Sequence, residues 1–373
     1  MILTAEYVSN GHVDRLCDSI VNNIVNYVVL KDEDALCGLE CAANTNKVFV
    51  DGVVKAGKTR KIINEEKIKD IVKETYFDAR YKEHQKDGNL CRCPIHPSPE
   101  ELEIILDVQI DRLCDEERAL RKYSDDQNAV TGYALNSPKT DYLPIEQFVA
   151  LKLGHWLCVG MWSTEGLDYG PDLKLLVQIE KDGQDYKWHR LSISAQHRHS
   201  SYDRMYRHLK SCVVDCLEIN AGDWWPRSLS KIDNEKLYVN GAGDFIDGGP
   251  LGDNGLSGKK LCIDFYGPSI PIGGGAIYGK DPHKVDVCGA LKARELAVKL
   301  VKEHNFYSVL TTLSWAPGEE TPCVIEAYEI DEFGTKMRID DSLLPPRESF
   351  SITAINNDLK LGERKIVSVH DIK

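Results

Sequence analysis

Two stretches rich in glycine and lysine lie between residues 248 and 286. The first reads GGPLGDNGLSGKK over residues 248–260, and the second reads GGGAIYGKDPHKVD over residues 273–286. Glycines let backbone amides approach an anion, and lysines supply the charge that a polyphosphate needs. A solvated surface loop is the alternative, but four lysines with interspersed aspartates favour a polyphosphate site. The sequence has no Walker-type lysine loop and no G-x-G-x-x-G at a strand end, so this site would be of another kind.

The spacing of apolar residues predicts the elements that hold these loops. Helical spacing predicts amphipathic helices over residues 16–27, 205–216 and 285–300, and shorter helices over residues 64–76 and after Pro144. Strands are predicted at residues 48–50, 103–109, 175–180, 186–194, 261–265, 308–315 and 323–330. Asp182 and Gly183 predict a hairpin turn between two of them. Lys284 and Asp286 would then stand at a helix start, whose amides favour phosphate.

The order of these elements favours an α+β fold. Helix and strand patterns recur about three times without strict βαβ alternation, which argues against a doubly wound parallel sheet. A chain of 373 residues with 42% hydrophobic residues can bury a separate core in each of two or three domains. We therefore expect three similar α+β domains, over residues 1–118, 119–241 and 242–373.

Charge and hydropathy exclude several classes of partner. The net charge of -13 argues against nucleic acid or an anionic membrane, because polyanions repel such a field and no basic run offsets it. No stretch approaches the roughly 20 apolar residues that span a bilayer, and residues 1–17 lack a basic head before an apolar run. We therefore expect a cytoplasmic protein. Its 12 irregularly spaced cysteines are expected to be reduced thiols.

Residues 81–100 are polar, contain proline and cysteine, and are predicted to be an inserted loop. Cys91, Cys93 and His96, with His84 nearby, could bind zinc, which usually takes four Cys or His ligands. Their irregular spacing favours a loop with two thiols over a metal site.

The glycine- and lysine-rich stretches resemble signature stretches of the S-adenosylmethionine synthetases, also called methionine adenosyltransferases. Other blocks follow in family order: SNGHVDR at 9–15 resembles SEGHPDK, SDDQNAVTGYALN at 124–136 resembles GDQGLMFGYATN, GPDLK at 170–174 resembles RPDAKSQV, and AQH at 195–197 resembles TQH. The resemblance covers most of residues 1–330. It implies the fold of that family, with three similar α+β domains in a pseudo-threefold arrangement.

The resemblance also implies site residues by position. The implied catalytic residues are His12, beside the bridging oxygen of the triphosphate, and Lys174, Lys260 and Lys280. The implied ATP and phosphate contacts are Asp126, Asp172, Phe245, Lys259, Lys260, Lys280 and Lys284. Gln109 and Asp253 would bind methionine, and Glu40 would lie near a potassium ion. Asp14 and Asp286 would bind two magnesium ions, in agreement with the preference of magnesium for hard carboxylate oxygens beside phosphates.

Taken singly, several of these residues have a structural interpretation. His12 could cap a helix, Asp14 could be a first-turn acid that the helix dipole stabilises, and Phe245 could be a core aromatic. The shared order of the motifs favours the functional interpretation.

The implied reaction is attack of the methionine sulfur on C5′ of ATP, with triphosphate released and then hydrolysed to phosphate and pyrophosphate. The sulfur carries no proton to remove, so catalysis must come from alignment and from cations that stabilise the departing triphosphate. The resemblance further implies a homodimer or a dimer of dimers, with active sites between subunits.

The chain departs from the family pattern at several positions. Arg15 replaces a lysine, Val13 a proline, Asn128 a glycine and Lys259 an arginine, and Ile272 precedes the GGGA. Lys259 loses the bidentate fork of arginine. Val53 stands where the family has a glutamate that helps to hold methionine. A non-catalytic or regulatory homologue, and an ATP-dependent adenosyltransferase with another nucleophile, therefore remain alternatives.

Overall fold

The computed structural model of this protein describes residues 1–57, 59–81, 97–163, 168–183, 185–198, 201–223, 225–363, 365 and 368–372. These residues form twelve β-strands and nine α-helices. The zinc candidates Cys91, Cys93, His96 and His84 lie outside the described residues. Among the described helices, none combines the length and the apolar composition that a bilayer crossing needs.

The elements follow one another in three runs. The first run is β1 (Ile2–Val8), α1 (Val13–Val29), β2 (Leu36–Asn44), β3 (Lys47–Ala56), α2 (Thr59–Ile62), α3 (Glu65–Asp78), β4 (Glu103–Arg112) and α4 (Asp115–Leu120). The second is β5 (Asn128–Leu135), α5 (Ile145–Ser163), β6 (Asp168–Asp182), β7 (Asp185–Arg198), α6 (Tyr202–Asn220) and β8 (Leu237–Val239). The third is β9 (Gly255–Leu256), α7 (Leu261–Asp264), α8 (Cys288–His304), β10 (Ser308–Trp315), β11 (Val324–Ile330), β12 (Lys336–Arg338) and α9 (Ile352–Leu359).

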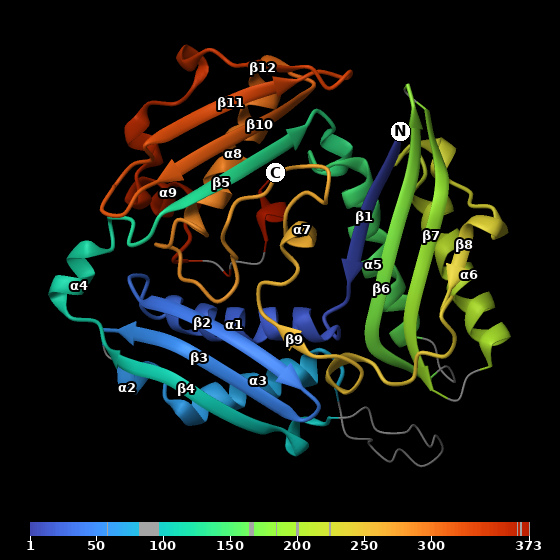
Figure 1. Ribbon diagram of the computed structural model, residues 1–373, viewed down its shortest axis with the longest axis horizontal. Helices are drawn as coiled ribbons and strands as arrows, with labels where there is room; N and C mark the ends of the chain where they lie inside the picture. Colours follow the sequence, from blue (N-terminus) through green and yellow to red (C-terminus); the bar gives the residue numbers. More distant parts are fainter. Residues whose placement is uncertain are drawn as a thin grey trace.

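The strands form three four-stranded sheets around the centre of the molecule (Figure 1). Sheet A has the order β1-β6-β7-β8, sheet B the order β9-β2-β3-β4, and sheet C the order β5-β10-β11-β12. In each sheet the edge strand named first pairs antiparallel with its neighbour and comes from a different run of the chain than the other three. The predicted ranges 1–118, 119–241 and 242–373 thus each hold three strands of one sheet and the edge strand of another.

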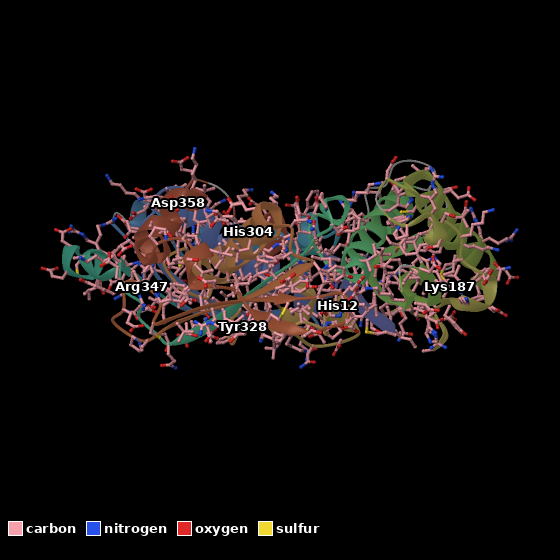
Figure 2. The ribbon with its side chains drawn as sticks, turned by 90° about the horizontal axis from the view of Figure 1, so that it is seen from above. His12, Lys187, His304, Tyr328, Arg347 and Asp358 are labelled. Atoms are coloured by element: carbon pink, nitrogen blue, oxygen red, sulfur yellow. The ribbon has the colours of Figure 1, made fainter. Side chains whose placement is uncertain are left out.

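The helices repeat the same pattern. After β1, helix α1 packs on β2 and β9; after β5, α5 packs on β1 and β6; and after β9, α8 packs on β5 and β10. A buried core that includes α5 and α8 joins sheets A and C, and a second core lies between sheet B and helices α1 and α3. The α+β class with three similar units in a pseudo-threefold arrangement is therefore confirmed. Viewed from above, the molecule is flat, and His12 lies away from both ends of its long axis (Figure 2).

Most predicted elements are present. Asn64 caps α3 by accepting a hydrogen bond from the amide of Lys67, α5 follows Pro144, and the Asp182–Gly183 hairpin joins β6 to β7. Two local predictions are wrong. The strand predicted at 261–265 is the short helix α7, in which the amides of Asp264 and Phe265 donate hydrogen bonds to the carbonyls of Lys260 and Leu261. Helix α8 begins at Cys288 rather than at 285, so Lys284 lies in the turn before it.

Candidate active site

His12 is the N-cap residue of α1 and lies directly before its first residue, Val13. Its Nδ1 accepts a hydrogen bond from the amide of Asp14 at 3.2 Å, so the proton of the neutral ring resides on Nε2. The ring is buried, and this burial, together with the charges of Lys174 and Lys260, lowers the pKa of His12 to about 4. The ring is therefore a neutral hydrogen-bond donor at neutral pH.

This assignment predicts the titration of His12 in the free enzyme. Because burial and the nearby ammonium groups disfavour the imidazolium, the ring is expected to stay neutral from about pH 8 down to about pH 5. An NMR titration of the ring nitrogens, assigned with His12→Asn, measures this. A protonation midpoint for His12 near that of a solvent-exposed histidine would contradict it.

Asp14, in the first turn of α1, lies among cations. Its Oδ1 accepts a hydrogen bond from the amide of Leu256 at 3.0 Å and lies 3.1 Å from Nζ of Lys259, while its Oδ2 lies 2.7 Å from Nζ of Lys260. Burial alone would raise the pKa of Asp14, but the bonds from Lys260, Leu256 and Lys259 outweigh it and lower the pKa. The carboxylate is thus ionised and holds both lysines beside the start of α1.

Asp172 and Lys174, on strand β6, lie near the start of α1. A Cβ on Gly11 would lie 2.3 Å from the carbonyl oxygen of Pro171, so only glycine allows this approach. Asp172 Oδ2 accepts a hydrogen bond from the amide of Gly249 at 2.8 Å, and its buried Oδ1 has no partner in the described structure. Burial raises the pKa of Asp172 to about 6. It therefore offers an unused acceptor in the site.

Lys174 differs from the other lysines predicted for this site, because it forms no ion pair within the described part of the chain. Its Nζ lies 5.9 Å from the centre of the Phe245 ring. Asp253 is exposed, and its charge acts on His12. The fold thus brings together eight predicted residues, which we call the His12 group: His12, Asp14, Asp172, Lys174, Phe245, Asp253, Lys259 and Lys260.

The other predicted phosphate residues lie in a second cluster before α8, together with the predicted magnesium ligand Asp286 and with Asp125. We call this cluster the Lys280 group: Asp125, Asp126, Lys280, Lys284 and Asp286. Nζ of Lys280 donates to Oδ1 of Asp286 at 2.6 Å, and Lys284 pairs with Asp125. A Cβ on Gly275 would meet Asp286 Oδ1 at 1.6 Å, so this glycine gives the carboxylate its space. Asp126 is exposed and accepts a hydrogen bond from the amide of Gln127.

Among the described residues, no hydrogen bond or ion pair joins the His12 group to the Lys280 group. Both groups border strand β2 of sheet B. The amide of Ser257, in the loop before Lys259, donates to the carbonyl of Cys41, and Lys280 forms a β-bridge with Gly38. Both groups therefore border β2, at the edge of the face of sheet B that the helices leave open.

The remaining two predicted residues lie on that open face. Gln109 is exposed on the edge strand β4 and pairs in register with Val53, which in turn lies opposite Gly38. Glu40 is exposed on β2 and accepts a hydrogen bond from Oγ of Ser257 at 2.5 Å. Within the described part of the chain, neither residue forms a hydrogen bond or ion pair with the predicted phosphate ligands, so their roles stay predictions.

Three charged residues of the site region were not predicted. Asp125, rather than Asp126, pairs with Lys284. Asp18 and Asp264 are buried and bind Arg15 behind the Lys259–Lys260 pair. Asp18 lies one helical turn after Asp14, and that spacing could have indicated it.

The carboxylates fit a metal that arrives with a polyphosphate. The described residues contain no group of three or more His, Cys, Asp or Glu that could hold an ion alone. Asp14 and Asp286 are single carboxylates, each beside lysine ammonium groups. Magnesium is commonly bound through one or two carboxylates plus phosphate oxygens and water, so this donor set fits.

Comparison with known proteins gives the family. The model of the S-adenosylmethionine synthetase N-terminal domain matches residues 1–98, and that of the C-terminal domain matches residues 247–369. The chain belongs to the S-adenosylmethionine synthetase family, and it is a transferase enzyme. The match extends past residue 330, where the recognisable motifs end.

Relatives cover almost the whole chain. The S-adenosylmethionine synthase of Zymomonas mobilis is 28% identical over 372 residues, which cover 97% of this chain and 89% of the relative. That of Tropheryma whipplei is 30% identical over 358 residues, which cover 92% and 86%. The structure of an unusual S-adenosylmethionine synthetase from Campylobacter jejuni has a TM-score of 0.80 at 23% identity and covers 100% of this chain and 92% of that one. This likeness shows a shared fold.

Proposed function

We propose that this protein is a methionine adenosyltransferase that forms S-adenosylmethionine from ATP and L-methionine. The observation that carries the proposal is the cluster of a neutral buried histidine, three lysines and an ionised aspartate at the start of α1, in a chain of this family. Triphosphate is the group that such a cluster fits, because it carries several negative charges and leaves with one more.

In this proposal the enzyme needs no general base. The thioether sulfur of methionine attacks C5′ of ATP, the C5′–O bond breaks, and the electron pair goes to the triphosphate. His12 Nε2–H donates a hydrogen bond to the bridging oxygen as it gains charge, and Lys174 and Lys260 stabilise the oxygens around it. The same cations then assist hydrolysis of the triphosphate to phosphate and pyrophosphate.

Asp14 and Asp286 would hold magnesium in the loaded enzyme, which would supply charge neutralisation to the triphosphate oxygens. Lysines occupy both carboxylates in the structure: Lys259 and Lys260 bind Asp14, and Lys280 binds Asp286. Glu40 is the proposed neighbour of a potassium ion, and the cytoplasm is the proposed location.

Magnesium and triphosphate together are expected to stabilise the folded protein, and omission of either one is expected to abolish most of this stabilisation. Magnesium alone must displace Lys260 from Asp14 and Lys280 from Asp286, whereas triphosphate attracts these lysines and frees the carboxylates. Thermal unfolding with magnesium, with tripolyphosphate and with both is therefore expected to show a combined shift larger than the sum of the separate shifts. Asp14→Asn and Asp286→Asn are expected to lose this excess. A purely additive shift in the native enzyme would count against the assignment.

We further propose a homodimer whose active sites combine the His12 group of one subunit with the Lys280 group of the other. Two observations support it: the described residues make no direct bond between the groups, and both groups border the open face of sheet B. A partner seated on that face would bring its own Lys280 group to this His12 group. The same pairing could be repeated in a dimer of dimers.

Mixed dimers test this arrangement. Lys174→Met inactivates one group and Lys280→Met the other, so each homodimer is expected to be nearly inactive. A two-fold dimer that carries one subunit of each kind has one intact site, so random mixing is expected to restore about a quarter of the native activity. The two variants, expressed together with different tags, give the mixed species. Failure of purified mixed dimers to recover activity would place both groups in one subunit.

A single assay separates this function from its alternatives. Purified protein with ATP, magnesium and L-methionine is expected to yield S-adenosylmethionine, phosphate and pyrophosphate, measured by mass spectrometry. Val53, opposite Gln109 on sheet B, favours a second candidate, an adenosyltransferase with another nucleophile. That enzyme would leave methionine unused and release triphosphate products with a different acceptor. A non-catalytic or regulatory homologue would consume no ATP.

A further inference from the structure

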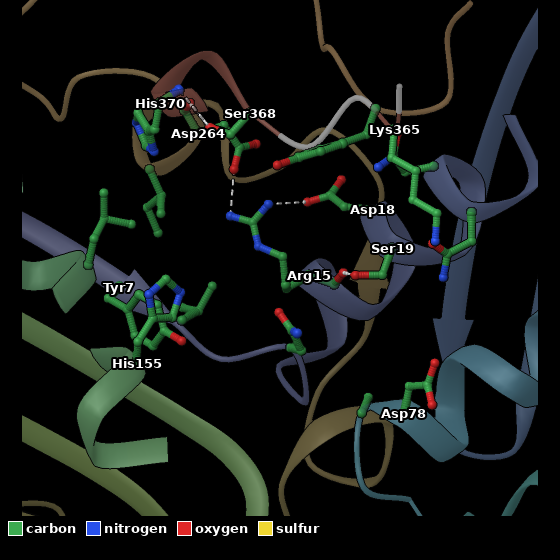
Figure 3. Close-up of a pocket in the computed structure, with 18 of the residues that line it drawn as sticks. Tyr7, Arg15, Asp18, Ser19, Asp78, His155, Asp264, Lys365, Ser368 and His370 are labelled. Atoms are coloured by element: carbon green, nitrogen blue, oxygen red, sulfur yellow. Dashed lines mark hydrogen bonds and ion pairs between the residues drawn. The ribbon is translucent and has the colours of Figure 1, made fainter. Parts of the chain in front are cut away.

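A cavity of about 510 Å³ lies beside α1, with Arg15 in its wall (Figure 3). One face of α1 lines it, together with parts of α3, α5 and α7 and residues 365, 368 and 370. His12 and Asp14 do not line the cavity. The residues that follow them on α1 therefore connect the proposed active site to this cavity.

Arg15 binds two buried carboxylates at the cavity wall. Its Nη1 donates to Asp18 Oδ2 at 3.3 Å, and its Nη2 lies 2.5 Å from Asp264 Oδ1. The Arg15 side chain is 12% exposed, and those of Asp18 and Asp264 are 1% and 3% exposed. Without the guanidinium, the two buried carboxyl groups would lose the cation that compensates for their burial, which is strongly unfavourable.

The two carboxylates that Arg15 binds lie on either side of the Lys259–Lys260 pair. Asp18 Oδ1 accepts a hydrogen bond from the amide of Gly258 at 2.8 Å, immediately before the lysines. Asp264 lies in α7, the helix that starts after Lys260, and its amide donates to the Lys260 carbonyl at 3.0 Å. The backbone of the lysine pair is therefore held from both ends.

The same helix also supplies the acceptor for the lysine side chains, since Asp14 binds Nζ of both Lys259 and Lys260. Asp14 and Asp18 are one helical turn apart on α1, so this one helix fixes the positions of the Gly258 amide and of both lysine amines. Gly258 has a φ of 76°. Because glycine can adopt many other backbone conformations, the hydrogen bond from its amide to Asp18 helps to keep it in this one.

We propose that Arg15 is a positioning residue: through Asp18 and Asp264 it fixes the Lys259–Lys260 pair relative to His12 and Asp14. The proposal rests on the proposed function for its effect on turnover. Its structural part, the immobilisation of residues 256–264, is independent of that function. In this role Arg15 acts through the two carboxylates and not on the reacting atoms.

Asp18→Ala and Asp18→Asn form a matched pair for the test. The alanine variant removes the acceptor of the Gly258 amide, whereas the asparagine variant retains an oxygen there. Hydrogen exchange of residues 256–264 is expected to accelerate in Asp18→Ala, with α8 protected as in the native enzyme, and Asp18→Asn is expected to restore most of the protection. Acceleration throughout the protein, or none at Gly258, would overturn the proposal.

Turnover gives the second readout. Misplacement of catalytic groups by about 1 Å can cost a hundredfold, so Asp18→Ala is expected to lose about that factor in kcat, with a smaller change in KM for ATP. Lys365 lines the same cavity and forms no ion pair with Asp18 or Asp264 among the described residues, so Lys365→Ala is the control for a general effect of charge. An equal loss in Lys365→Ala would overturn the proposal.

Arg15→Ala allows chemical rescue, because the cavity opens onto the position of the missing guanidinium. Millimolar guanidinium chloride is expected to restore part of kcat and the protection of residues 256–264, whereas sodium chloride at the same ionic strength is not. Equal recovery with both salts would overturn the proposal. If the native enzyme formed no S-adenosylmethionine, the proposed function would fail, while the exchange measurements would still test the role of Arg15.

Discussion

Lys174→Met is expected to lower the turnover number by roughly a hundredfold or more, while the affinity for ATP changes little. Lys174 forms no ion pair in the described structure, so its full charge is available to the triphosphate as the C5′–O bond breaks. Only interactions that strengthen in the transition state accelerate the step, and loss of one such contact typically costs about 3 kcal/mol. Steady-state kinetics at saturating methionine separate kcat from KM.

Lys187→Met is the matched control for this variant. Lys187 is an exposed lysine on β7 near one end of the molecule (Figure 2), so its loss removes the same charge without touching the site. It is expected to turn over at the native rate. Should Lys174→Met instead raise KM for ATP and preserve kcat, this lysine would only hold the nucleotide in its ground state.

His12→Asn is expected to lower turnover about a hundredfold without loss of thermal stability. Asparagine is among the best N-cap residues, so its oxygen can replace Nδ1 as the acceptor for the Asp14 amide. Its side chain is shorter than imidazole and does not carry a donor to the position of Nε2. The variant therefore keeps the start of α1 and removes the proposed hydrogen bond to the leaving oxygen.

His12→Ala separates the two roles of this residue. It removes the cap as well as the donor, so it is expected to lose about 1 kcal/mol of stability in addition to the loss of turnover. Thermal unfolding and kinetics on both variants measure this. A His12→Asn enzyme with near-native turnover would restrict His12 to capping the helix.

The parts of the fold that the sequence predicts are those with a local signal. Asn64 as a cap, Pro144 before a helix and Asp182–Gly183 in a turn each act on their own neighbours in the chain. No local signal shows that each sheet takes its edge strand from another run of the chain. Strand β5, for example, pairs with β10, which lies far along the chain. The apolar alternation at 261–265 predicted a strand wrongly, because the amides of Asp264 and Phe265 bond to the carbonyls one turn back instead of to a neighbouring strand.

The same limit applies to the site. Glycine and lysine composition predicts the phosphate loops, and the fold brings eight of the predicted residues together around His12. The separation of the Lys280 group from them could not be predicted, because it depends on how sheets B and C sit relative to each other. The role of Asp18 depends on the distant Gly258 amide, which only the folded chain brings within 2.8 Å.

The exchanged edge strands have a consequence for how the chain folds. Sheet B is complete only when β9, at residues 255–256, reaches β2, and sheet C needs β5 from the preceding run. When the first third of the chain has emerged from the ribosome, sheet B therefore still lacks its edge strand β9. Such high contact order slows folding and leaves strand edges exposed during synthesis. Once closed, each unit holds a strand of another, so a truncation that deletes one run is expected to unfold the sheet of its neighbour as well.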